Sequence, residues 1–134
     1  MFDAIPFNPG AGFSGIPEIT RVEYDLWVLR ITCDFDGHRE PVYLEFQNVE
    51  GFRVLDEGQL SAFWVNGPRA PGWLWEVKSG GWFELESNRS DFIMGLTFSL
   101  GGIVNSPREF IALGVSDCVS VITWDEPRAY AARP

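Results

Sequence analysis

Apolar and polar residues alternate most regularly between residues 27 and 35. A period of two is typical of a strand that buries one face. Asp36-Gly37 follows, and this pair favours a tight turn because the central residues of such turns need positive φ. The alternation resumes over residues 42–47, so the pattern predicts an antiparallel hairpin over residues 26–47. The expected inward-facing residues of its first strand are Trp27, Leu29, Ile31, Cys33 and Phe35.

Shorter runs of apolar and β-branched residues predict further strands. They lie at residues 18–24, 51–55, 73–77, 110–114 and 118–124. The last two runs predict a second hairpin, and both of its faces are apolar, as in the central strands of a sheet. Pro127 is expected to end the sheet.

Helical signals are confined to the middle of the chain. Asp56 and Gln59 have the spacing of a capping box, so a short helix is expected to begin there. A second short helix is expected within residues 82–91. Two Gly-rich regions without periodicity are expected to be irregular. They are an N-terminal arm at residues 1–17 and a loop at residues 93–107.

Together these elements predict a single α+β domain over residues 1–134, a length that suits one domain. The expected architecture is a mostly antiparallel, strongly curved β-sheet of about six or seven strands with one or two short helices.

The charge balance narrows the range of partners. The chain carries 19 acidic and 10 basic residues, for a net charge of −9, and nine of the acids lie in residues 1–50. Nucleic acids and anionic membranes select basic surfaces, so neither is an expected partner. The N-terminus lacks the pattern of an export signal, and no apolar run is long enough to span a membrane, so we expect a cytoplasmic protein. Cys33 and Cys118 lie in apolar runs and are expected to be buried free thiols.

Candidate catalytic chemistry is sparse. The only histidine, His38, lies in a predicted turn, and one histidine with two distant cysteines does not make a metal site. No cofactor motif is present, so neither a metal nor a cofactor is expected. Paired carboxylates are the remaining catalytic option, because a glycosidase needs two of them beside a cleft. The candidates are Asp56 with Glu57, Glu84 with Glu86, and Glu76 near either pair. The favoured interpretation is that Glu76 faces solvent and that Asp56 caps a helix.

The six tryptophans divide into two predicted groups. Trp27, Trp64, Trp73 and Trp124 lie on apolar faces and are expected in the core. Trp75 and Trp82 neighbour acidic residues and glycines, so they are expected to be partly exposed. Exposed tryptophans are enriched where proteins bind one another. The candidate partner-binding residues therefore form two patches, Asp34, Asp36 and Glu40 around the hairpin turn, and Trp75, Trp82, Glu84 and Glu86.

Three stretches carry a family resemblance: GFRVLDEGQL at 51–60, WLWEVKSGGWFELE at 73–86 and GVSDCVSVI at 114–122. They resemble small uncharacterised bacterial proteins, some of which look like immunity proteins of polymorphic toxin systems. The resemblance implies a cytoplasmic, acidic, non-enzymatic protein that blocks a toxin, and it assigns no functional residues.

The sequence thus favours binding over catalysis. The leading hypothesis is an immunity-like domain that binds a basic protein partner through an acidic face. One alternative is a saccharide or small-molecule binder, or a weak carboxylate-dependent hydrolase, working at Trp75, Trp82 and Glu84. The other alternative is a structural homo-oligomer, with a homodimer as its simplest form.

Overall fold

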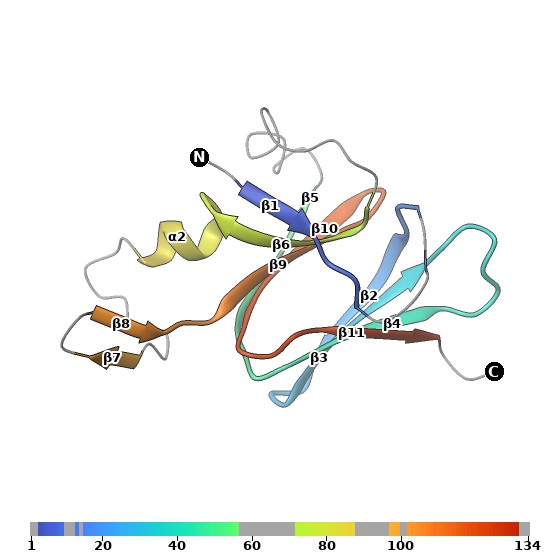
Figure 1. Ribbon diagram of the computed structural model, residues 1–134. Coiled ribbons are helices and arrows are strands. Elements are labelled where there is room, and N and C mark those ends of the chain that lie inside the picture. The colour runs from blue at the N-terminus through green and yellow to red at the C-terminus, as the bar shows by residue number, and fades with distance from the viewer. Residues whose placement is uncertain are drawn as a thin grey trace.

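The computed structural model describes residues 3–9, 13, 15–56, 72–87, 97–99 and 102–131. Within these residues the fold consists almost entirely of antiparallel strands arranged in two main sheets (Figure 1). One helix of six residues, α2 (Trp82–Ser87), accompanies them. The predicted α+β class with one strongly curved sheet is therefore wrong. More of the chain forms hydrogen-bonded strands than its short apolar runs suggested, and most of these strands are divided between two sheets.

The first sheet has five strands in the order β1-β6-β9-β10-β5. Its central hairpin, β9–β10, confirms the prediction for residues 110–124, with Cys118 opposite Leu113 and Thr123 opposite Arg108. The strands are β1 (Asp3–Pro6), β5 (Val49–Asp56), β6 (Leu74–Ser79), β9 (Arg108–Leu113) and β10 (Asp117–Thr123).

The second sheet has four strands in the order β11-β4-β3-β2. Its β3–β4 pair confirms the hairpin predicted for residues 26–47, with Ile31 opposite Leu44. The tight turn predicted at Asp36-Gly37 is confirmed, because His38 donates its backbone N–H to Phe35 O at 3.1 Å, although only Gly37 of the pair has positive φ. This turn lies within a longer connection formed by residues 35–41. The strands are β2 (Glu18–Tyr24), β3 (Val28–Asp34), β4 (Val42–Gln47) and β11 (Arg128–Ala131).

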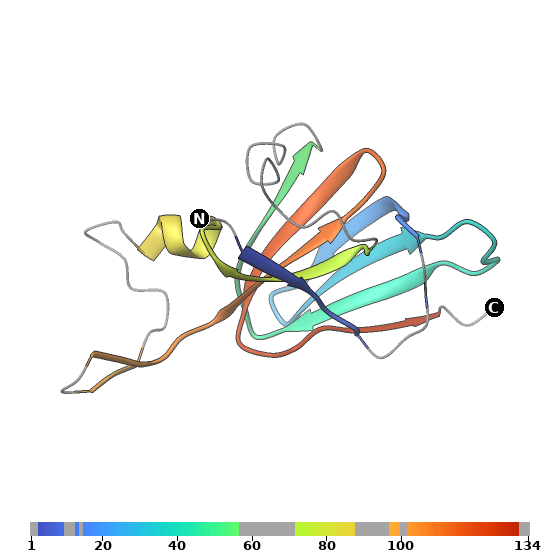
Figure 2. The same cartoon turned by 45° about the horizontal axis from the view of Figure 1, so that its top comes forward.

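Two bends carry the chain from one sheet to the other. Asn48, with φ of 53°, separates β4 from β5, and the segment after Thr123 separates β10 from β11. The bends are bonded to each other, because Trp124 donates its backbone N–H to Asn48 O at 3.1 Å and Thr123 Oγ1 donates to Gln47 O at 2.7 Å. Strands that change sheet at a bend form the corners of such packings. Figure 2 shows both bends at the same corner, next to the β2–β3 turn.

The core lies between the two sheets. The inward residues of β3 and β4 meet those of β6, β9 and β10, and most are completely buried. They include Leu29, Ile31, Cys33, Val42, Leu44, Phe46, Leu74, Phe110, Ala112, Val119 and Val121. A second buried cluster occupies the opposite face of the first sheet, with Ala4, Trp75, Val77, Ile111 and Cys118. The central strands of the first sheet are thus buried on both faces. Both cysteines are buried and free, as expected, and burial raises the pKa of Cys33 to about 12.

Several regions predicted to be irregular form strands. Residues 3–6 of the expected N-terminal arm form β1, which pairs with β6. The expected loop at 93–107 contains the ribbon of β7 (Thr97–Ser99) and β8 (Gly102–Asn105). The sheet also continues beyond Pro127 as β11. For β1 and β11 a partner strand distant in the sequence supplies the backbone hydrogen bonds, which local composition does not reveal, whereas β7 and β8 pair with each other.

Other predictions concern the ends of strands and helices. The strands at 18–24 and 73–77 are confirmed as β2 and β6, and the short helix within 82–91 is confirmed as α2. The helix predicted to begin at Asp56 falls mainly outside the described residues, as does Trp64. Asp56 itself ends β5.

Candidate functional site

The turn between β2 and β3 is built around the carboxylate of Asp25. Its Oδ1 accepts the backbone N–H of Val28 at 2.8 Å and that of Trp27 at 2.9 Å, and Asp25 N donates to Val28 O at 3.3 Å. Leu26 and Trp27 are therefore the two central residues of a tight hairpin turn. The amides of Val28 and Trp27 hold the pKa of Asp25 below its usual value. These hydrogen bonds fix the backbone of the turn, while the side chains at its centre are open to solvent.

Leu26 adopts a backbone conformation that favours glycine. Its φ is 79°, and the left-handed region costs a side chain with Cβ roughly 1–2 kcal/mol. A hairpin turn with positive φ at its first central residue usually has glycine there. The chain instead holds a large apolar residue at this strained position, and such outliers cluster at functional sites.

Both central residues of the turn are largely exposed. Trp27 is 82% and Leu26 is 78% exposed, the two highest values among the exposed large hydrophobic residues. The prediction that Trp27 lies in the core is wrong, because β3 begins one residue later and the turn directs the indole to solvent. The sequence placed Trp27 in phase with Leu29 and gave no sign of the turn.

The turn borders an open hollow of about 490 Å³ at the corner between the sheets. The β4–β5 and β10–β11 bends contribute its other sides. Figure 1 shows these two bends to the left of the label β3. We call this region the Trp27 surface. It is lined by Leu26, Trp27, Asn48, Val49, Glu50 and Trp124.

Carboxylates are held in place around the Trp27 surface. Trp124 Nε1 donates to Glu50 Oε1 at 2.7 Å, and the amide of Asn48 donates to Asp125 Oδ2 at 2.5 Å. With Asp25, these make three exposed acidic side chains around two tryptophans. Among the described residues, no lysine or arginine lines the hollow. The site combines apolar area with negative charge, so it suits a ligand that is partly apolar and cationic.

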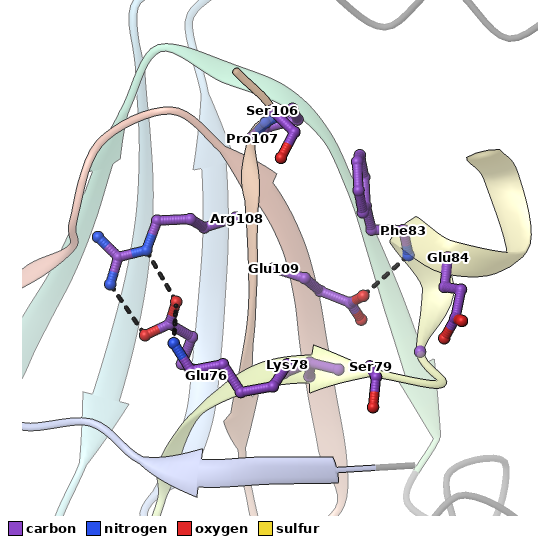
Figure 3. A pocket seen from close by; sticks show the side chains of 11 residues that line it. Glu76, Lys78, Ser79, Phe83, Glu84, Ser106, Pro107, Arg108 and Glu109 are labelled. Carbon is purple, nitrogen blue, oxygen red and sulfur yellow. Dashed lines mark hydrogen bonds and ion pairs between the residues drawn. The ribbon is translucent and has the colours of Figure 1, made fainter. Parts of the chain in front are cut away.

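A second pocket, of about 220 Å³, lies where β6 and β9 diverge (Figure 3). Glu76 accepts two hydrogen bonds from Arg108, both at 2.8 Å, and pairs with Lys78 at 3.2 Å. Arg108 also pairs with Glu126 at 3.1 Å. The Arg108 hydrogen bonds are the main cause of the lowered pKa of Glu76. The prediction that Glu76 faces solvent is wrong, because the residue is 5% exposed.

Glu109 lies on the other side of this pocket. It is 4% exposed and accepts the backbone N–H of Phe83 at 2.8 Å and of Trp82 at 3.2 Å. Burial raises the pKa of Glu109. The carboxylate thus satisfies the first amides of α2, which the helix leaves without internal partners. Glu84 similarly accepts the backbone N–H of Gly80. The pocket's charged groups are bonded to one another and to the backbone, which is the arrangement of a structural network.

The predicted partner-binding residues fall in three places. Asp34, Asp36 and Glu40 lie together around the β3–β4 connection, and the two aspartates are exposed. This acidic end is at the opposite end of β3 from Trp27, about 20 Å away at the usual rise of a strand. The two sites are therefore separate.

The second predicted patch is split. Trp75 is 1% exposed and belongs to the buried cluster of the first sheet, so its predicted exposure is wrong. Trp82 is half-buried on α2, where its Nε1 donates to Glu86 at 3.2 Å and Arg53 lies over its ring. Glu84 and the neighbouring Leu85 of this helix are exposed. Sequence reasoning instead missed Leu26 and Trp27 as exposed residues. The prediction that Trp124 lies in the core is also wrong, because Trp124 is half-buried and lines the hollow.

Comparison of the chain with known protein families, with curated proteins and with solved structures finds no match. Within the described residues, no helix has the length and apolar character that a membrane crossing requires. The same part of the chain holds no group of three or more histidine, cysteine or acidic residues arranged to bind a metal ion.

Proposed function

We propose that this protein is a non-enzymatic binding domain that docks a basic protein partner on the Trp27 surface. The exposure of Leu26 and Trp27 on a turn held by Asp25 is the observation that carries the proposal. Large apolar side chains concentrated on a surface mark interaction sites, and tryptophan is prominent among binding hot spots. Because the turn is fixed by three hydrogen bonds, little conformational entropy is lost when a partner covers it.

Charge favours a basic partner over other occupants. The chain carries a net charge of −9, and Asp25, Glu50 and Asp125 surround the tryptophans. A second copy of the chain would bring like charges together, and phosphates of nucleic acids or anionic lipids would be repelled. A protein with lysine or arginine beside apolar residues matches both the apolar centre and the acidic rim.

The acidic end contributes in a different way under this proposal. Asp34, Asp36 and Glu40 are too far from Trp27 to share one small contact, but their field attracts a basic protein during approach. The resemblance to immunity proteins of polymorphic toxin systems implies a role of the same kind, in which an acidic cytoplasmic protein blocks a toxin. The saccharide or hydrolase alternative needs Trp75 at a pocket, and the burial of Trp75 removes one of its three residues.

A capture experiment with a matched pair of variants tests the proposal. The full chain and its Trp27→Ala and Leu85→Ala variants are immobilised, exposed to lysate of the source cells at low and high salt, and the retained proteins are identified by mass spectrometry. Leu85 is a matched control because it is a large apolar residue, 62% exposed, on α2. Neither change should unfold the protein, since exposed substitutions usually alter stability by less than about 0.5 kcal/mol.

The expected result is one stoichiometric basic protein that the wild type and Leu85→Ala retain and Trp27→Ala loses. High salt should weaken its retention, because the acidic rim contributes to the attraction. Equal retention by all three proteins would contradict the proposal. Binding to lipid vesicles that depends on Trp27 would also contradict it, because it would assign the surface to a membrane.

A further inference from the structure

We propose that the Trp27 surface receives an arginine side chain of the partner, placed against the Trp27 ring and bonded to Glu50. This inference deepens the proposed function and rests on it. It comes from a comparison between the Trp27 surface and an arrangement that the chain builds elsewhere with its own arginines.

The internal comparison is the site around Glu45 on β4. Tyr130 Oη donates to Glu45 Oε2 at 2.7 Å, and Arg30 Nε donates to the same carboxylate at 3.0 Å. The guanidinium of Arg30 also lies over the ring of Tyr43, 4.7 Å from its centroid. One aromatic residue thus orients the carboxylate, a second offers its ring face, and an arginine completes the site.

The Trp27 surface has the first two parts of this arrangement. Trp124 Nε1 donates to Glu50 Oε1 at 2.7 Å, as Tyr130 does to Glu45, and Trp27 offers an exposed ring. The described part of the chain does not supply the third part, because neither arginine nor lysine is among its residues that line the hollow. A carboxylate has about four lone-pair positions, so Glu50 keeps the capacity to accept from a guanidinium.

The same pairing recurs at one further site in the described part of the chain, around Arg108, and a second arginine, Arg128, joins the Glu45 site. Arg108 lies over Phe110 at 5.3 Å while bonded to Glu76, and Arg128 lies over Tyr130 at 5.7 Å and within 3.7 Å of Glu45. Arginine suits such sites because its planar guanidinium stacks on a ring and bonds a carboxylate at once, whereas lysine offers a point charge. We therefore expect arginine to be preferred. Leu26 and Val49 supply apolar walls for its methylene stem.

The test uses N-acetyl-arginine amide as the probe and N-acetyl-citrulline amide as its uncharged control of nearly the same shape. Each is titrated into the full chain while the indole N–H signals of Trp27 and Trp124 are followed by NMR. The arginine probe should shift both signals saturably, and the citrulline probe should not. Glu50→Gln, which keeps an acceptor for Trp124, should weaken binding of the arginine probe roughly two- to fivefold, the range of an exposed ion pair. Glu18→Gln removes the same charge from an exposed site on β2 and should leave binding unchanged.

Absence of saturable shifts at these two indoles, or equal shifts with citrulline, would overturn the arginine assignment. An unchanged affinity in Glu50→Gln would overturn it as well. These failures are distinguishable from failure of the proposed function. If Trp27→Ala loses the captured partner while the probe shows no preference for arginine, the docking surface stands and the arginine inference falls. If Trp27→Ala keeps the partner, the proposed function itself falls.

Discussion

Asp25 and Trp27 are joined by a hydrogen bond of 2.9 Å, from the backbone N–H of the tryptophan to the carboxylate of the aspartate. The bond lies within a turn whose next residue, Val28, makes a second bond to the same oxygen. The carboxylate thereby fixes the backbone beneath the most exposed tryptophan of the described chain. A surface ring on a rigid support is suited to binding, because a partner need not order it first.

Removal of the Asp25 carboxylate should loosen the turn. We expect Asp25→Ala to lower the free energy of unfolding and to speed amide hydrogen exchange of Trp27 and Val28. The pKa of Asp25 is lowered in the folded state, so its contribution is complete above the unfolded pKa and is lost as the pH falls through the folded pKa. The stability difference between wild type and Asp25→Ala, measured by urea denaturation, should therefore shrink in acid. A difference that is constant across this pH range would show that the carboxylate does not act through these bonds.

Relief of backbone strain at Leu26 should raise the stability of the protein while weakening its binding to the partner. Leu26→Gly removes a penalty of roughly 1–2 kcal/mol for positive φ, against about 0.5–1 kcal/mol of added chain entropy in the unfolded state. We expect a gain of about 0.5 kcal/mol in unfolding free energy, with weaker partner capture because an apolar contact is lost. Val54→Gly, at an exposed position within β5, should instead lose stability, because glycine weakens a strand interior. Loss of stability in Leu26→Gly would contradict the strain argument.

The acidic end should influence the rate of association. Reversing Asp34, Asp36 and Glu40 to lysine is expected to slow binding of the basic partner and to reduce the salt dependence of the rate, with little change in dissociation. Trp27→Ala should instead speed dissociation and change the association rate little, because loss of a central contact acts mainly on dissociation. Surface plasmon resonance with the captured partner distinguishes the two. An association rate unchanged by the triple reversal would remove the acidic end from the account.

Glu76 and Glu109 should make opposite contributions to the pH dependence of stability. The pKa of Glu109 is raised by burial, so its ionisation opposes folding as the pH rises through its usual range. The pKa of Glu76 is lowered by Arg108, so its contribution is lost as the pH falls. We therefore expect Glu109→Gln to flatten the decline of stability with rising pH, and Glu76→Gln to flatten the decline in acid. Chemical denaturation across pH measures both effects. The difference in unfolding free energy between wild type and variant should change with pH in opposite directions for the two variants. A change in the same direction for both would contradict the assignment.

The sequence predicted the strands whose pairing is local. Alternation and intervening turns identified the β3–β4 and β9–β10 hairpins, because neighbouring strands satisfy each other's hydrogen bonds and share one buried face. It did not predict β1, β11 or the division into two sheets. β1 pairs with β6 and β11 pairs with β4, each across a long sequence separation that short-range pattern does not encode.

The candidate site was less predictable than the fold. The alternation assigned Trp27 to the buried face, and only the hydrogen bonds of Asp25 show that the turn interrupts it. Leucine carries no sequence signal for the positive φ seen at position 26. Trp75 was misplaced for the opposite reason, because the acidic Glu76 follows it in the sequence while both faces of its strand are covered. Burial of Glu76 depends on Arg108, which follows 32 positions later.

The most direct measurement of the central claim is amide hydrogen exchange of the full chain with and without its captured basic partner. The account predicts that the partner protects the turn at residues 25–28 and the bend at residues 48–50, the two segments that frame the Trp27 surface. The acidic end at residues 34–40 should change little, because it acts during approach rather than in the final contact. Protection confined to the acidic end or to α2, with the Trp27 turn exchanging as in the free protein, would contradict the account.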